Sequence, residues 1–149
     1  MPFDYLEDIA TADIAFSAWE KDLAGLFLAS WDAVLQVMVD DIESISRKPD
    51  SDKVEVHEIN LHHNEPDMLL YDFLGELIYY KDAKNLLLRP ESLSIEYRDS
   101  TYTAKAKLRG VLIEGSGIDL GLDVKAITFH LFEVRQNEKG WEARVVLDV

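Results

Sequence analysis

The residues of this sequence best suited to chemistry are carboxylates near its two ends. The sequence finishes with VVLDV, so the Asp148 side chain and the α-carboxylate of Val149 share a small volume. Near the start, within TADIAF, Asp13 interrupts an apolar run that is typical of a strand. If the two strands meet, three carboxylates converge, and such a cluster requires either a raised pKa or a bound cation. Oxygen-only ligands favour a hard ion such as Ca²⁺, Mg²⁺ or Mn²⁺.

A bound ion would also explain why the sequence stops inside an apolar strand, because terminal residues fray unless something holds them. The alternative is that Asp13 caps a turn and Asp148 is an exposed edge residue, with no metal involved. A metal-dependent hydrolase is another reading, but it needs a general base, and His130 is the clearest candidate. The absence of cysteine excludes thiol nucleophiles and zinc–thiolate sites.

Charge and length limit the remaining classes. Acidic residues number 29 and basic residues 15, giving a net charge of −14 that disfavours nucleic acid and favours cations or a basic protein surface. Solubility alone is the alternative explanation. The 149 residues, 48% of them hydrophobic, predict one domain over residues 1–149. With neither a signal-peptide pattern nor an apolar run of membrane length, we expect a soluble, cytoplasmic protein with no membrane contact.

The elements that must position the carboxylates are predicted to form an α+β fold, with two helices packed on a largely antiparallel β-sheet. The first helix is expected over residues 22–38, with Asp22 as its N-cap. The second can be capped by Asn64, with Pro66 in its first turn. It carries one broad apolar stripe made of Leu70, Phe73, Leu74, Leu77 and Ile78.

The strand segments differ in pattern. KVEVHEINL changes the parity of its apolar residues, which suggests a bulge or a bend. LSIEYRDSTYTAKAKLRG predicts a hairpin whose solvent side carries a basic row, either a solvated face or a binding stripe: Lys105, Lys107 and Arg109. VKAITFHLFEV is nearly all apolar, which predicts a strand covered on both faces. The short turn after it should make the last two strands neighbours.

The histidines offer little metal chemistry. His62 and His63 are adjacent, so on an extended segment they point to opposite faces, and a solvated turn before the second helix is favoured. His130 lies in an apolar strand, where it is either a hydrogen-bonded core residue or a functional one.

The segments TADIAF, VKAITFH and ARVVLDV, in this order and with the last at the end of the sequence, resemble the archease family. This family provides the protein cofactor of the RtcB-type tRNA-splicing ligase, and the resemblance covers essentially the whole chain. It implies a Ca²⁺ site formed by Asp13, Asp148 and the terminal carboxylate of Val149. It also implies a functional cluster for the partner: Lys125, Thr128 and His130.

The resemblance further implies an accessory protein rather than an enzyme. Archeases promote guanylylation of the ligase by GTP and its multiple turnover, so the expected partner is an RtcB-type ligase, without direct nucleic-acid contact. Two features depart from the family pattern. Ile9 and Ala10 replace the usual Asp-His before TAD, and the loop before VKA lacks an Arg-His pair. A chaperone-like partner of RNA-processing proteins is a further alternative.

Overall fold

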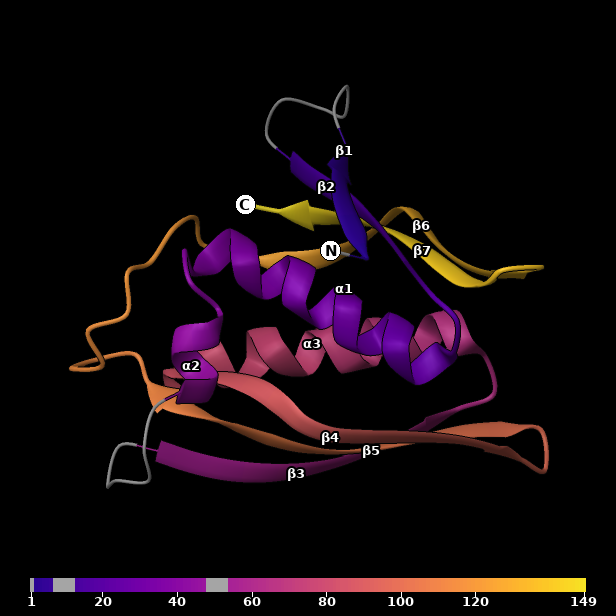
Figure 1. Ribbon diagram of the computed structural model, residues 1–149, viewed down its shortest axis with the longest axis horizontal. Coiled ribbons are helices and arrows are strands. Elements are labelled where there is room, and N and C mark those ends of the chain that lie inside the picture. Colours follow the sequence, from indigo (N-terminus) through magenta and orange to yellow (C-terminus); the bar gives the residue numbers. More distant parts are fainter. Residues whose placement is uncertain (1, 7–12, 48–53) are drawn as a thin grey trace.

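Two antiparallel sheets enclose a layer of helices in this computed structural model, which describes residues 2–6, 13–47 and 54–149 (Figure 1). The four-stranded sheet has the order β1-β2-β7-β6, with bounds Phe3–Leu6, Asp13–Glu20, Gly140–Asp148 and Ala126–Asn137. The three-stranded sheet has the order β3-β5-β4, with bounds Val54–His63, Thr101–Leu112 and Leu86–Arg98. The α+β prediction is confirmed, but the expectation of one sheet is wrong, because the helices are covered on two sides.

Helix α1 (Leu23–Met38) forms as its sequence predicts. The Asp22 carboxylate accepts a hydrogen bond of 2.6 Å from the amide of Gly25, which confirms the N-cap. The helix contacts β2 and β7 on one side and β4 on the other. Trp31 is fully buried, and its indole Nε1 donates to the Leu88 carbonyl at 3.0 Å, so α1 is anchored to both sheets.

The N-cap of helix α3 (Pro66–Lys84) lies one residue later than predicted. Glu65 is the N-cap and makes no side-chain capping bond, so the assignment of Asn64 is wrong. Pro66 accounts for the difference, because its fixed φ suits the first helical position and keeps the preceding residue extended. The apolar stripe is confirmed: Leu70, Phe73, Leu74 and Leu77 are buried and Ile78 packs against the core. A short helix, α2 (Glu43–Arg47), was not predicted.

Strand β3 is regular, so the predicted bulge is wrong. Its register with β5 runs without a shift, and Ile59 faces the core while Val56 is 49% exposed on the other face. The change of parity in the sequence therefore reflects an exposed valine. The hairpin of β4 and β5 is confirmed, with its ladder irregular between Pro90 and Ser92.

Strand β6 pairs with β7 as predicted, but it is not covered on both faces. The ladder is interrupted between Thr128 and Glu133, where Leu131 has a φ of 55°. Phe129 is 60% exposed and Leu131 is 43% exposed, so apolar residues in this segment form an exposed bulge rather than a buried strand. Within the described residues, no helix is long and apolar enough to cross a bilayer.

Candidate metal centre

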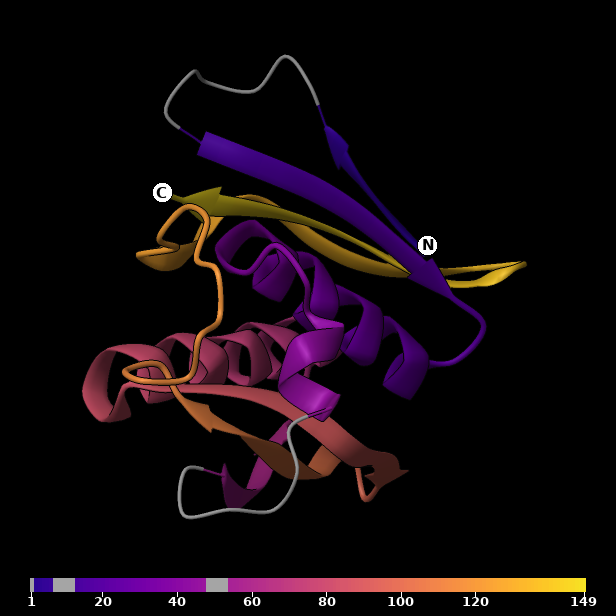
Figure 2. The same cartoon turned by 60° about the vertical axis from the view of Figure 1, so that its left-hand side comes forward.

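Asp13 and Asp148 are brought together by the four-stranded sheet. Asp13 begins β2, Asp148 ends β7, and the two residues are direct partners in the antiparallel ladder. Directly opposed side chains point to the same face, with Cβ atoms roughly 4.5–5.5 Å apart. In Figure 2 the end of the chain lies beside the start of β2. The structure therefore shows the meeting of strand ends on which the sequence prediction depended.

The end of the chain is held from both sides. Strand β7 lies between β2 and β6, and Asp148 is paired with Asp13 on one side and Ala126 on the other. The amide of Lys125 donates to the main-chain carbonyl of Asp148 at 2.8 Å. Val149 is half-buried and packs against the hydrophobic core. Its α-carboxylate is thus attached to a residue that is already fixed in position.

Asp13 and Asp148 place two negative charges together without a paired positive charge among the described residues. Among the residues that the structure describes, neither the Asp13 nor the Asp148 carboxylate has a hydrogen-bond or ion-pair partner. Like charges directly opposite each other destabilise a sheet, and a cation between them would remove that repulsion. The donor atoms are all oxygens, which suits Ca²⁺, Mg²⁺ or Mn²⁺.

The α-carboxylate is essential to this fit. The described part of the chain contains no group of three or more Asp, Glu, His or Cys side chains that could hold a metal ion. Two aspartates alone are a sparse ligand set for Ca²⁺, which takes six to eight oxygens. The residues therefore fit a hard cation with Asp13, Asp148 and the terminal carboxylate as the protein donors and water as the remainder.

Space is available next to Asp13. A cavity of about 400 Å³ adjoins it between β1, the C-terminal part of α1 and the segment after β5. The cavity is lined by Tyr5, Leu6, Asp13, Ile14, Gln36, Val37 and Leu122. Asp13 itself is half-buried and Asp148 is exposed, so the pair is accessible from solvent.

The three residues of the expected partner cluster have different environments. Lys125 is exposed and adjoins Asp148 through its amide. The Thr128 hydroxyl donates to the Val146 carbonyl at 3.0 Å, so this side chain joins β6 to β7 close to the site. His130 is exposed in the bulge of β6, which excludes a core histidine. Among the described residues, His130 does not form a metal-binding group with the two aspartates.

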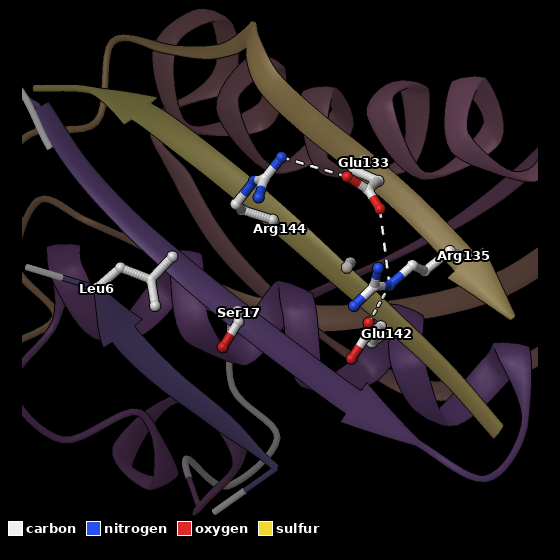
Figure 3. A pocket seen from close by; sticks show the side chains of 7 residues that line it. Leu6, Ser17, Glu133, Arg135, Glu142 and Arg144 are labelled. Carbon is white, nitrogen blue, oxygen red and sulfur yellow. Dashed lines mark hydrogen bonds and ion pairs between the residues drawn. The ribbon is translucent and has the colours of Figure 1, made fainter. Parts of the chain in front are cut away.

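A second group of charged residues was missed at the sequence level. On β6 and β7, Glu133, Arg135, Glu142 and Arg144 alternate in sign across the ladder and line a cavity of about 260 Å³ with Leu6 and Ser17 (Figure 3). Arg144 pairs with Glu133 at 3.2 Å, and Arg135 pairs with both Glu133 and Glu142. The sequence signal for this group is that charged residues recur at every second position on both sides of the last turn, at 133 and 135 and at 142 and 144. The charges balance, so this group is a cross-strand network with no excess of either sign.

The adjacent histidines and the basic row, which the sequence analysis also singled out, lie on strands and have local polar partners. His62 and His63 are the last residues of β3 rather than a turn, and the His63 Nδ1 accepts from the Glu65 amide at 3.1 Å. In the basic row, Lys107 and Arg109 both pair with Glu91, at 3.5 Å and 3.7 Å. Its positive charge is thus partly compensated by a neighbouring acid.

These features define a small α+β protein with two paired aspartates and a fixed strand end on one face of a sheet. The sequence matches the model of the Archease protein family over residues 3–149, and the chain belongs to this family. It is 30% identical over 140 residues to the protein archease of Pyrococcus abyssi, covering 93% of this chain and 94% of that one. It is 31% identical over 140 residues to that of Pyrococcus furiosus, with the same coverage.

Solved structures support the fold. The solution structure of protein 1598 from Methanobacterium thermoautotrophicum superposes with a TM-score of 0.79 at 27% identity, covering 99% of both chains. The crystal structure of a Thermotoga maritima archease, described as a possible chaperone, gives a TM-score of 0.60 and covers 93% of this chain and 92% of that one. Its identity is 19%, so it supports the α+β fold alone.

Proposed function

We propose that this chain is the accessory protein of an RtcB-type RNA-splicing ligase and is not itself an enzyme. It binds Ca²⁺ through Asp13, Asp148 and the α-carboxylate of Val149, and it promotes guanylylation of the ligase by GTP and multiple turnover in tRNA splicing. The observation that carries the proposal is the direct cross-strand pairing of the two aspartates at the fixed end of β7. We expect it to act in the cytoplasm.

Each part of the site has a separate function in this proposal. A bound Ca²⁺ supplies the positive charge that offsets the carboxylates. The two aspartates and the terminal carboxylate hold the ends of β2 and β7 in one arrangement, and the exposed Lys125 lies next to them for contact with the ligase. The net charge of −14 suits docking on a basic active-site mouth. Activation then requires a coupling free energy of about 1–3 kcal/mol, the usual range for allosteric effects.

Ligase stimulation tests this proposal. The cognate ligase is incubated with GTP labelled at the α-phosphate, and the label transferred to the ligase and the RNA joined per ligase molecule are measured with and without this protein. The wild-type protein should increase both quantities, and Asp13→Asn should lose the effect. The matched control is Asp4→Asn, which removes one exposed carboxylate from β1 of the same sheet, opposite Ser17. Failure of the wild-type protein to stimulate its ligase in the presence of Ca²⁺ would refute the proposal.

Two other functions predict results that additional assays distinguish. A metal-dependent hydrolase would cleave a phosphoester without the ligase, but the structure leaves His130, its candidate base, exposed in the bulge of β6. A chaperone-like role agrees with the description of the Thermotoga maritima protein and with several exposed apolar residues: Leu120, Leu122, Phe129 and Leu131. That role predicts suppression of ligase aggregation that survives Asp13→Asn.

A further inference from the structure

The segment between β5 and β6, residues 113–125, runs along one end of the molecule from the three-stranded sheet to the four-stranded sheet (Figures 1 and 2). It is irregular but it is attached at several points. The Gly121 amide donates to the Met38 carbonyl at 2.8 Å and the Leu122 amide to the Val37 carbonyl at 3.1 Å. These carbonyls belong to the last turn of α1, where helices leave acceptors unpaired. The segment therefore caps the C-terminal end of α1.

Gly121 is needed for this contact. A Cβ at this position would lie 2.7 Å from the Val37 carbonyl oxygen, closer than a side chain can approach. Glycine thus permits the segment to run against the end of the helix. Contacts with α1 therefore fix the path of residues 120–122. The next three residues, 123–125, lead to the proposed metal centre and need a separate attachment.

Lys81 provides that attachment. It is one of the last residues of α3, its side chain is only 8% exposed, and its Nζ donates to the Asp123 carboxylate at 2.7 Å and to the Asp82 carboxylate. Burial opposes the charged form, but the hydrogen bonds to the two aspartates raise the pKa of Lys81 above its ordinary value. The ammonium group therefore stays charged at neutral pH.

A buried ammonium group is poorly explained by stability alone. Desolvation of an ion costs several kcal/mol, and replacing a buried ion pair with apolar residues often leaves a protein equally stable. The Asp82 and Asp123 side chains are 56% and 64% exposed, so each can be hydrated without the lysine. What Lys81 adds is a directional link between α3 and residue 123, 42 positions further along the chain.

That link leads directly to the proposed site. Val124, which follows Asp123, is fully buried, and the next amide, that of Lys125, donates to the Asp148 carbonyl at 2.8 Å. We propose that Lys81, acting through Asp123, is a positioning residue that holds Lys125 against β7 and so keeps Asp148 and the terminal carboxylate arranged for Ca²⁺. The effect on Ca²⁺ rests on the proposed metal site. The positioning of Lys125 by Lys81 can be tested in the metal-free protein.

The two partners of Lys81 allow a matched test. Asp123→Asn and Asp82→Asn each remove one of the two carboxylate charges that pair with Lys81. Only Asp123 lies in the segment that leads to Lys125. Ca²⁺ affinity is measured by calorimetric titration at two salt concentrations, and amide hydrogen exchange of Lys125 is measured without Ca²⁺. Asp123→Asn should weaken Ca²⁺ binding by about fivefold or more, within the range for mutations along a coupled network, and should accelerate exchange of the Lys125 amide. Asp82→Asn should change neither quantity more than about twofold.

A third variant separates positioning from stability. Lys81→Met fills similar space without charge, so thermal stability should change little, while the Ca²⁺ affinity and Lys125 exchange should change as in Asp123→Asn. Equal effects of Asp123→Asn and Asp82→Asn, or unchanged exchange of Lys125 in Asp123→Asn, would overturn the inference. If the wild-type protein binds no Ca²⁺, the metal part of the proposed function fails, and the exchange of Lys125 still decides whether Lys81 positions this segment.

Discussion

Replacing Asp13 with asparagine should stabilise the metal-free protein and abolish its stabilisation by Ca²⁺. The two aspartates are opposed in the ladder, so their Cβ atoms lie about 5 Å apart, and we take the same separation for their charges. Coulomb's law gives a repulsion of about 0.8 kcal/mol at the dielectric constant of water, rising to about 3 kcal/mol at an effective value of 20. Asp148 is exposed and Asp13 is half-buried, so screening keeps the repulsion near the lower figure, about 0.5–1 kcal/mol.

For a chain of this size, 1 kcal/mol shifts the melting temperature by about 2–4 °C. Asp13→Asn should therefore melt about 1–4 °C above the wild-type protein in a chelator. At a free Ca²⁺ concentration of 100 times the dissociation constant, the wild-type protein gains about 2.7 kcal/mol, or about 5–10 °C, and the variant gains nothing. The order of the two melting temperatures thus reverses when Ca²⁺ is added.

Scanning calorimetry of both proteins, with chelator and with Ca²⁺, measures all four temperatures. Asp4→Asn is the control, since it removes an exposed carboxylate elsewhere on the sheet and should follow the wild-type protein in both conditions. Asp13→Asn melting below the wild-type protein in chelator, or keeping the full rise with Ca²⁺, would contradict the roles given to this carboxylate. The first result would mean that the Asp13 carboxylate is stabilising without a metal, and the second that it is not a ligand.

Three other perturbations test different parts of the structure. Adding Gly-Ser after Val149 converts the α-carboxylate into a peptide and should weaken Ca²⁺ binding at least about tenfold by calorimetric titration, a loss of about 1.4 kcal/mol, whereas the same addition before residue 1 should not. Arg89→Met should lower the free energy of unfolding in urea by about 1.5–3 kcal/mol, because Asp32, 25% exposed, would lose its paired cation at 3.0 Å. Tyr5 is 41% exposed, but partial burial raises its pKa to about 12, and its hydroxyl donates to the Ala33 carbonyl at 2.7 Å. The unfolded chain ionises this tyrosine near pH 10, so its contribution to stability is complete below pH 10 and is lost as the pH rises towards about 12. Tyr5→Phe should flatten that decline in a pH series of urea unfolding curves.

The sequence predicted the elements that depend on local periodicity. Helix α1, with Asp22 at its N-cap, the buried stripe of α3 and the two hairpins all follow from patterns a few residues long. The meeting of Asp13 with Asp148 did not follow from such patterns and entered the prediction only as a condition, because alternation along a strand does not say which strands pair. The pairing of β2 with β7 joins residues at opposite ends of the chain and has no local signal, and only the Ca²⁺ site implied by the family resemblance required the two aspartates to be close.

The number of sheets was wrong for a reason that the sequence contained. A helix packed on one sheet buries one stripe, whereas α1 also buries Ala29, Ser30 and Ala33, and thus most of its circumference. A helix that is apolar on most sides is enclosed by the protein, and here the second sheet completes the enclosure. The link from Lys81 to Asp123 could not be predicted, because a lysine near a helix end and an aspartate in an irregular segment are ordinary surface residues until the fold brings them together.

The strand order bears on the proposal that the last residue is a metal ligand. A terminal carboxylate on an edge strand would move with the fraying of that strand, and each binding event would have to order it. Strand β7 is instead flanked by β2 and β6, so its last residues are hydrogen-bonded to neighbours on both sides. Asp13 comes from one flanking strand, and the Lys125 amide comes from the residue before the other. The proposed ligands are therefore positioned before any ion arrives, because the final strand lies inside the sheet rather than at its edge.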